Sequence, residues 1–207
     1  MKDLIIIGSG GHCRSVISIA KLLASWSTIR IADLDFKNQE EFIMGVKVTS
    51  LNECLKRNKD NLEIFTAIGD NQKRKIIYNG LSNEGYKFIN LIHPKSFIDQ
   101  SAHIGNGNYI GQFSNIGAEV KIGNCNIINS YANLEHEVII GNFNHMAPST
   151  TICGRSRISN NIFMGVNSTI IQNLAISEGV IIGAGSVVFQ SIEKDNQKVA
   201  GTPARNI

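Results

Sequence analysis

Two histidines, one of them between two glutamates, are the residues of this sequence whose types and spacing could do chemistry. Glu135, His136 and Glu137 are consecutive, and His145 follows nine residues after His136. Histidine exchanges protons near neutral pH, so His136 could serve as a general base. An adjacent carboxylate can hold an imidazole in one tautomer and favour the imidazolium that forms. An isolated His-Glu pair is more often a solvated surface feature, so the choice depends on the scaffold that carries it.

That scaffold is a six-residue repeat. Every sixth residue from Ile98 to Val188 is apolar, which makes 16 consecutive positions. At the apolar content of this chain, such a run arises by chance about once in a million tries. Three units of six residues close a triangular coil, and neighbouring coils stack at the strand spacing of about 4.8 Å. The period therefore predicts a parallel β-helix with an apolar interior.

Glycine follows the apolar position in much of this repeat, and we expect it to supply the backbone conformation of the sharp corners. The pattern changes near the histidines, where Asn129 and Glu135 occupy positions that are usually glycine. Departures from a regular scaffold are expected at functional sites, so the scaffold favours a catalytic His136 over a solvated one. The glycines of the repeat stand at positions 105, 111, 117, 123, 141, 165 and 183.

Residues 1–93 alternate strand-like and helical segments, which predicts a small Rossmann-like α/β domain with a parallel sheet. Ser50 and Glu53 form a capping box ahead of a short helix. Pro94 disfavours regular structure at the residue before it, so we expect one domain at 1–93 and a second at 94–207. The expected strands cover residues 4–7, 29–32, 64–68 and 86–92, and the longer helices cover residues 12–23 and 71–82.

A glycine-rich turn, residues 8–12, separates the first strand from the first helix, where backbone N–H groups attract a phosphate. It is not a full dinucleotide fingerprint, because Cys13 takes the place of the third glycine. A plain glycine turn is the alternative. Asp33 and Asp35 follow the second strand, where an acidic residue commonly binds a ribose hydroxyl. Gly69 begins a second strand-to-helix turn at the same edge of the sheet.

Composition excludes several other classes of protein. The net charge is only +3 and the basic residues form no block, which favours neither nucleic acid nor a membrane surface. The apolar run near the N-terminus is too short for a signal peptide or a membrane span. The four cysteines are far apart and suit the reducing cytoplasm. No three histidines are spaced to converge on a metal ion, so we expect no metal.

Five motifs in this order resemble one family along nearly the whole chain. They are Gly-Gly-His after the first strand, Ile-Gly-Asp-Asn-x-x-Arg, Ile-His-Pro at the junction, Glu-His-Glu-x-x-Ile-Gly-x-x-x-His, and Val-Ala-Gly-Thr-Pro-Ala-Arg near the end. The chain resembles the NeuD/PglD-type bacterial sugar O/N-acetyltransferases. The resemblance implies a Rossmann-like nucleotide-sugar-binding domain at 1–93. It also implies a left-handed parallel β-helix of hexapeptide repeats, the acyltransferase domain, at 94–207.

The resemblance also implies a homotrimer with active sites between neighbouring β-helices and acetyl-CoA as co-substrate. His136 matches the general base and Glu137 the carboxylate that raises its basicity. His145 matches a residue near the acetyl-CoA thioester, while Val166 and Ala184 match positions whose backbone meets the pantetheine arm. The residues that match the nucleotide-sugar site are Gly10, Gly11, His12, Asp33, Asp35 and Gly69.

We therefore predict a cytoplasmic enzyme that transfers acetyl from acetyl-CoA to the amine of a UDP- or GDP-linked amino sugar. The amine would attack directly with His136 as base, without a metal or a cysteine nucleophile. O-acetylation of a sialic-acid-type sugar is an alternative on the same fold. A non-catalytic or metal-dependent trimer, such as a relative of γ-carbonic anhydrase, is the alternative from another class.

Overall fold

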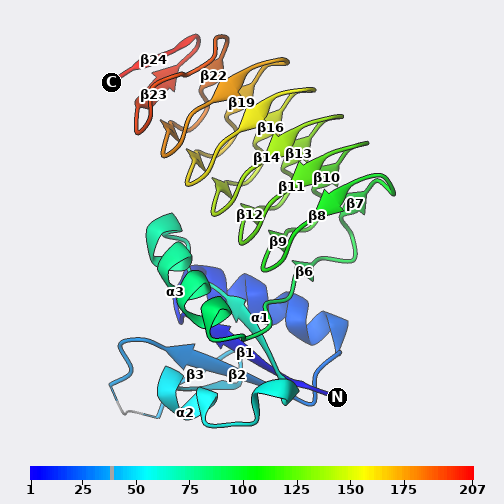
Figure 1. Ribbon diagram of the computed structural model, residues 1–207, viewed down its shortest axis with the longest axis vertical. Coiled ribbons are helices and arrows are strands. Elements are labelled where there is room, and N and C mark those ends of the chain that lie inside the picture. The colour runs from blue at the N-terminus through cyan, green and yellow to red at the C-terminus, as the bar shows by residue number, and fades with distance from the viewer. Residues whose placement is uncertain (38–39) are drawn as a thin grey trace. The chain divides into compact units, whose positions relative to one another are not determined.

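The computed structural model describes residues 1–37 and 40–207. The chain divides into two compact units, Met1–Leu91 and Ile92–Ile207 (Figure 1). The first is an α/β unit and the second a three-sided parallel β-helix, which confirms the predicted fold class.

The α/β unit contains a five-stranded sheet in the order β3-β4-β2-β1-β5. Strands β1, β2, β4 and β5 run parallel, and β3 is antiparallel to β4. Residues 4–7 of β1 are fully buried, because β1 is central and has a strand on each side. The strands are β1 (Asp3–Ile7), β2 (Thr28–Asp33), β3 (Phe42–Ile43), β4 (Val46–Ser50) and β5 (Leu62–Thr66).

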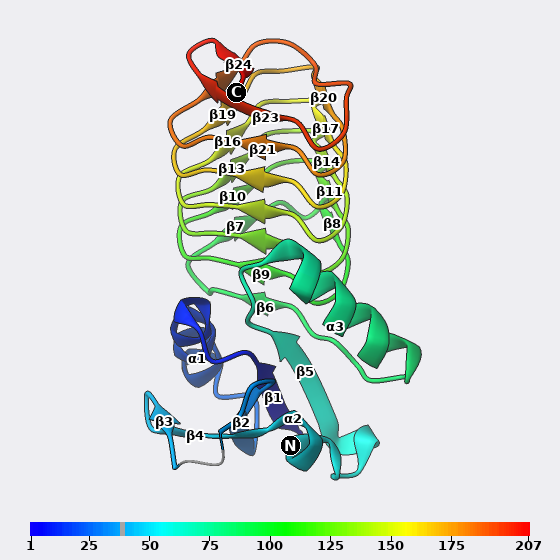
Figure 2. The same cartoon turned by 90° about the vertical axis from the view of Figure 1, so that its left-hand side faces the viewer.

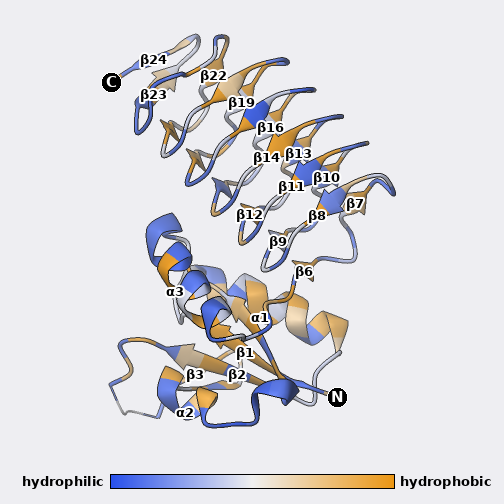
Figure 3. Ribbon diagram, viewed as in Figure 1, coloured by the Kyte–Doolittle hydropathy of each residue, from blue (hydrophilic) through white to orange (hydrophobic). Residues whose placement is uncertain are grey.

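Three α-helices and one 3₁₀ turn connect these strands. They are α1 (Gly11–Leu23), α2 (Leu51–Leu55), η1 (Lys59–Asn61) and α3 (Asn71–Asn83). The predicted cap of α2 is present, since the Ser50 hydroxyl accepts a hydrogen bond from the Glu53 N–H. Figure 3 shows hydrophobic colour along β1 and a mainly hydrophilic α3. The expected strand at 86–92 is wrong as one element: Phe88 forms an isolated bridge with Ile64, and Leu91 and Ile92 begin the β-helix as β6.

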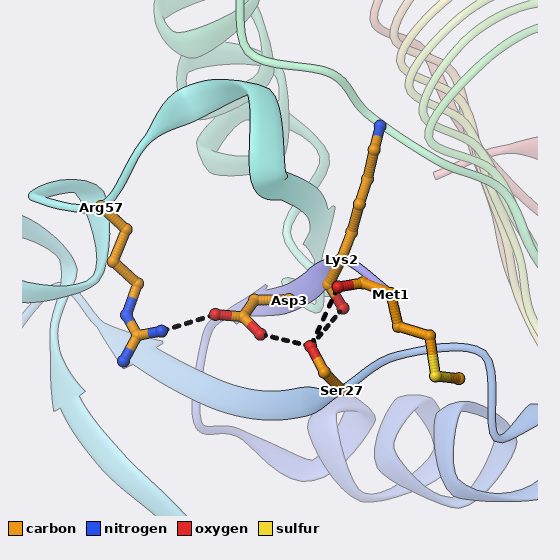
Figure 4. Close-up of polar contacts among 5 residues, drawn as sticks. All are labelled: Met1, Lys2, Asp3, Ser27 and Arg57. Carbon is orange, nitrogen blue, oxygen red and sulfur yellow. Dashed lines mark hydrogen bonds and ion pairs between the residues drawn. The ribbon is translucent and has the colours of Figure 1, made fainter.

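Hydrogen bonds and an ion pair lie at the amino ends of β1 and β2. The Ser27 hydroxyl donates to Asp3 Oδ1 at 2.8 Å, and Arg57 Nη1 donates to Asp3 Oδ2 at 2.5 Å (Figure 4). Burial alone would raise the pKa of Asp3, but hydrogen bonds from Thr28, Ser27 and Arg57 outweigh it, and the pKa lies below its ordinary value. This edge of the sheet therefore depends on an ionised carboxylate.

The β-helix consists mainly of two-residue strands, and from β9 (Tyr109–Ile110) to β22 (Val187–Val188) the second residue of each strand is buried in the interior. Each strand pairs with strands one coil away, 18 residues along the chain, as Leu134 pairs with Ile152. Figure 2 shows the strands stacked in columns, which form three faces of a prism. The first face contains β7 (Phe97–Ile98), β10 (Asn115–Ile116), β13 (Asn133–Leu134), β16 (Thr151–Ile152), β19 (Thr169–Ile170) and β22 (Val187–Val188).

The second and third faces complete the prism, and their inward residues join one buried apolar cluster with those of the first face. The second contains β8 (His103–Ile104), β11 (Lys121–Ile122), β14 (Ile139–Ile140), β17 (Arg157–Ile158) and β20 (Ala175–Ile176). The third contains β6 (Leu91–Ile92), β9 (Tyr109–Ile110), β12 (Ile127–Ile128), β15 (His145–Met146), β18 (Phe163–Met164), β21 (Ile181–Ile182), β23 (Lys198–Gly201) and β24 (Ala204–Asn206).

The corners correct one expectation about glycine. A left-handed backbone recurs every sixth residue from Gly107 to Gly185, and most of the residues that adopt it are not glycine. The glycines that follow the inward position do not have a positive φ. A Cβ at Gly123 would lie 2.5 Å from the carbonyl oxygen of Gly141 in the next coil. These glycines are needed because neighbouring coils approach closely there, and not for the turn itself.

Buried asparagines satisfy the backbone at the corner between the second and third faces. Oδ1 of Asn108 accepts from the N–H of Asn126 at 2.8 Å, and Oδ1 of Asn126 accepts from the N–H of Asn144 at the same distance. Each Asn is at most 1% exposed. This neutral ladder pairs buried amides from coil to coil.

Candidate active site

His136 and Glu137 lie on the turn that joins β13 of the first face to β14 of the second, which we call the first corner (residues 135–138). His136 Nδ1 and Glu137 Oε2 are 3.0 Å apart. Since Nδ1 faces a carboxylate, it carries the ring proton, and Nε2 keeps its lone pair. Both side chains are exposed in the single chain, at 56% and 41%. The pair presents a basic nitrogen at the surface of the prism.

Arg155 completes this polar group from the next coil. Its Nε donates to the same Oε2 of Glu137 at 2.8 Å. The hydrogen bond from His136, followed by that from Arg155, holds the pKa of Glu137 below its ordinary value. Glu137 is therefore an anion near neutral pH and can stabilise a positive charge on the imidazole. Arg155 stands 18 residues after Glu137, which is the register of one coil.

Gly154 makes room for the imidazole. A Cβ at this residue would lie 2.5 Å from Cε1 and 2.6 Å from Nε2 of His136. The ring of His136 thus packs on the backbone of the coil above, and a side chain at 154 would displace it. Sequence reasoning missed both Gly154 and Arg155. The signal that could have found them is the 18-residue coil length, which places 154 and 155 over 136 and 137.

His145 lies elsewhere on the prism, on β15 of the third face. Its ring meets that of Phe163, the paired residue of β18, edge to face at 5.2 Å between centroids. Within one chain, His145 and His136 belong to different faces, as the spacing of nine residues requires.

Val166 and Ala184 share a third location, the corner that leads from the third face to the first. They occupy equivalent positions in adjacent coils, and Val166 is half exposed. A Cβ at Gly165, just before Val166, would lie 2.4 Å from the backbone nitrogen of Ala184. The two expected contacts with the pantetheine arm therefore lie together, while His136 is at another corner of the same chain.

The expected nucleotide-sugar residues meet around one cleft of the α/β unit. The cleft has a volume of about 470 Å³ and lies at the carboxyl ends of β1, β2 and β5. The Ser9 hydroxyl donates to Asp33 Oδ2, and Asp33 Oδ1 accepts from the Asp35 N–H at 2.8 Å. Helix α1 begins here at Gly11 with no acidic residue in its first turn. Gly10, Gly11, His12, Asp33, Asp35 and Gly69 all line this cleft.

Arg74 supports the cleft from behind. It is only 1% exposed, and its Nη1 donates to the carbonyl oxygens of Ile68 and Gly69 at 2.9 and 3.2 Å. Lys73, the preceding residue, lines the cleft. Both cations follow the same turn in the sequence. In the structure, Arg74 is buried and supports the turn, whereas Lys73 lines the cleft and can contact a ligand.

The cysteines show no activation for covalent chemistry. Burial, and then the nearby Glu135 carboxylate, raise the pKa of the Cys153 thiol. Burial also raises the pKa of Cys13, to about 11. Among residues 1–37 and 40–207, no three His, Cys, Asp or Glu side chains group as metal ligands. Over the same residues, no helix is long and apolar enough to cross a membrane.

Several known proteins are similar to this chain in sequence and in structure. The family described as "PglD N-terminal domain" matches residues 3–81. UDP-N-acetylbacillosamine N-acetyltransferase of Bacillus subtilis is 32% identical over 115 residues, which cover 53% of this chain and 51% of that protein. The chain thus spans about half the length of this curated relative.

Several solved structures match over the full chain, and two that contain bound ligands bear on the site. One is the acetyltransferase domain of PglB from Neisseria gonorrhoeae with acetyl coenzyme A, with a TM-score of 0.91, 26% identity and coverage of 100% of this chain and 99% of that one. The chain resembles these acetyltransferases in the sequence of its first unit and in its fold. The second is a histidine-to-alanine variant of GDP-perosamine N-acetyl transferase from Caulobacter crescentus with CoA and GDP-perosamine. Its TM-score is 0.91, with 26% identity and coverage of 100% of this chain and 97% of that one. The predicted resemblance to the PglD-type acetyltransferases is confirmed.

Proposed function

We propose that the protein is an acetyl-CoA-dependent N-acetyltransferase that acts on the amine of a nucleotide-linked amino sugar. The observation that carries the proposal is the His136–Glu137 pair, with Nδ1 held by a carboxylate and Nε2 left with its lone pair. The support from relatives is the full-length match to structures that hold acetyl coenzyme A, or CoA and GDP-perosamine.

The chemistry follows from the charges at the first corner. The sugar amine attacks the thioester carbonyl and becomes positively charged as the C–N bond forms. His136 Nε2 accepts a proton from this nitrogen, directly or through one water. Glu137 stabilises the resulting imidazolium through Nδ1, and the thiolate leaves when the tetrahedral intermediate collapses. A donor such as His145 or a backbone N–H stabilises the oxyanion on the carbonyl oxygen.

A homotrimer explains why the expected residues are spread over one prism. His145 is on the third face, and Val166 and Ala184 are on the corner beyond it, whereas His136 is on the first corner. A threefold arrangement of three prisms can bring the first corner of one chain to the third face of its neighbour. Acetyl-CoA would then bind between two chains.

The cleft of the α/β unit is proposed to hold the nucleotide part of the acceptor. The N-terminus of α1 at Gly11 offers backbone N–H groups to a diphosphate. Asp33 and Asp35 offer carboxylates to sugar or ribose hydroxyls. The four cysteines form no disulfide bond, which fits an enzyme of the reducing cytoplasm.

The test is His136→Ala, with His103→Ala as a matched control on the exposed side of β8. We expect the first variant to bind acetyl-CoA with unchanged affinity and to lose about 100- to 10,000-fold in kcat. The control should keep both values. Acetyl-CoA binding is measured by calorimetry, and turnover by release of CoA. Full activity of His136→Ala would remove the proposal.

O-acetylation is the second candidate, because the same base can deprotonate a hydroxyl. The amine is favoured since the curated relative and the Caulobacter enzyme are named as N-acetyltransferases. Mass spectrometry of products from UDP- and GDP-linked amino sugars and from their hydroxyl analogues distinguishes the two reactions. A mass gain of one acetyl group only on hydroxyl acceptors would establish the second.

A further inference from the structure

Arg155 contacts the His136–Glu137 pair, although the proposed reaction gives Arg155 no role. Its guanidinium meets Oε2 of Glu137, the same oxygen that faces His136 Nδ1. Its backbone N–H also donates to the carbonyl oxygen of His136 at 3.0 Å. Arg155 therefore contacts both members of the pair, and each of these contacts crosses from one coil to the next.

The fold fixes this arrangement. Glu137 and Arg155 occupy the left-handed position of the first corner in successive coils, with φ values of 60° and 63°. The N–H of Glu137 in turn donates to the carbonyl oxygen of Ala118 at 2.8 Å. With both backbones held in this ladder, the two side chains leave the prism in parallel and meet. A residue at 155 too short to reach Glu137 would leave its carboxylate with one neighbour fewer.

We propose that Arg155 is a positioning residue, which holds the Glu137 carboxylate against Nδ1 of His136 and places a positive charge beside the pair. The proposal rests on the proposed function of His136 as the base. The positive charge of Arg155 disfavours a positive charge on the nearby imidazole, whereas the Glu137 carboxylate favours it. The charge of Arg155 therefore opposes the effect of Glu137 on the imidazole, while its hydrogen bond keeps the Glu137 carboxylate in place.

Charged groups of both signs flank this turn, since Lys121 and Arg157 pair with Ile139 in the strands of the two adjoining coils. Glu119 occupies the same corner position one coil earlier, and Glu135 precedes His136 in its own coil. Glu135 Oε1 accepts from Asn133 Nδ2 at 2.8 Å, on the first face. Arg155 is the cation that hydrogen-bonds to Glu137. Removing its charge takes away the positive charge that Glu137 contacts directly, so a positive charge on the imidazole becomes less costly.

The experiment compares Arg155→Gln with Arg155→Lys and with Arg157→Gln, which removes a similar exposed charge from β17. For Arg155→Gln we expect kcat to fall about fivefold, the factor for a well-formed exposed ion pair. We also expect the acidic limb of the kcat/KM profile to move to higher pH. Arg155→Lys should restore that limb and part of kcat, because it keeps the charge but loses the planar guanidinium. Arg157→Gln should resemble the unmodified enzyme.

A second measurement does not depend on activity. The ¹³C signal of the Glu137 carboxyl, assigned by its loss in Glu137→Gln, is followed over pH in each variant. We expect the pKa of Glu137 to rise in Arg155→Gln and to stay unchanged in Arg157→Gln. Unchanged rates and an unchanged Glu137 titration in Arg155→Gln would overturn the proposal, as would equal effects from Arg157→Gln. If the enzyme itself transfers no acetyl group, the titration still tests whether Arg155 acts on Glu137.

Discussion

The two units of this protein bring functional residues together in different ways. In the α/β unit, Gly10, Asp33 and Gly69 come from separate connections and meet because β1, β2 and β5 are parallel neighbours. In the β-helix, His136 and Arg155 meet because one coil takes 18 residues. The first site depends on strand order, and the second on register.

The difference teaches where each site is vulnerable. A register site is made from backbones in direct contact, so a single added carbon atom changes its geometry. A site at the ends of parallel strands is an open cleft whose side chains act more independently. Mutations should therefore affect the first corner through position, and the cleft through the loss of single contacts.

Gly154→Ala should give the largest effect and tests the register site. The backbone of Gly154 does not have a positive φ, so alanine can adopt its backbone conformation. Its Cβ would press on His136 at Cε1 and Nε2 and displace the ring. A shift of about 1 Å at a catalytic group costs about 100-fold in rate, and we expect kcat to fall by that factor. Steady-state kinetics and thermal unfolding of the variant measure the two consequences.

Two controls show whether this loss comes through His136. Gly80→Ala adds the same methyl group to α3, where no heavy atom lies within 4 Å, and should leave kcat unchanged. In a His136→Ala background, Gly154→Ala should cause no further loss. A full additional loss in the double variant would mean that Gly154 acts on something else.

The same contrast explains what the sequence could predict. The period of six predicted the β-helix and the apolar residues that face its interior. One residue in each hexad must be apolar, whatever the types of the other five residues. His136 and Glu137 could be found because they are adjacent. The partners at 154 and 155 require counting one full coil. The predicted role of the glycines at the corners is wrong. A turn with a positive φ and a close approach of two backbones both favour glycine, and the sequence alone does not distinguish these two causes.

Asp35→Ala should have a smaller effect and tests the cleft. Its backbone N–H, which donates to Asp33, is kept, so the loop should hold while one carboxylate is lost. The loss of one hydrogen bond to a charged group predicts that KM for the nucleotide sugar rises about tenfold. KM for acetyl-CoA and kcat should not change. Asp60→Ala, which removes an exposed carboxylate from η1, is the control. A fall in kcat with constant KM would place Asp35 at the reaction rather than in binding.

The smallest expected effect is a loss of stability of the α/β unit at low pH. The two units differ in the hydrogen-bond partners of their polar groups. The β-helix uses neutral asparagine ladders, whereas the amino edge of the α/β sheet uses the ionised Asp3 with Arg57 and Ser27 (Figure 4). The pKa of Asp3 is lowered in the folded state. The stability it contributes is therefore present above its ordinary value of 3.8 and is lost as the pH falls through the folded value.

Arg57→Ala should lower the free energy of unfolding of the α/β unit by about 0.5 kcal/mol at pH 7, and by less at pH 3, where Asp3 begins to protonate. Trp26 is the single tryptophan of the chain and bonds to Glu63 in this unit, so its fluorescence follows the α/β unit alone during urea unfolding. Lys56→Ala, one residue earlier, is the control and should show neither change. In the unmodified protein the tryptophan transition should move to lower urea on acidification before the far-ultraviolet circular dichroism of the β-helix changes. If both transitions moved together, acid would be acting on the whole chain rather than on the ion pairs of one sheet edge.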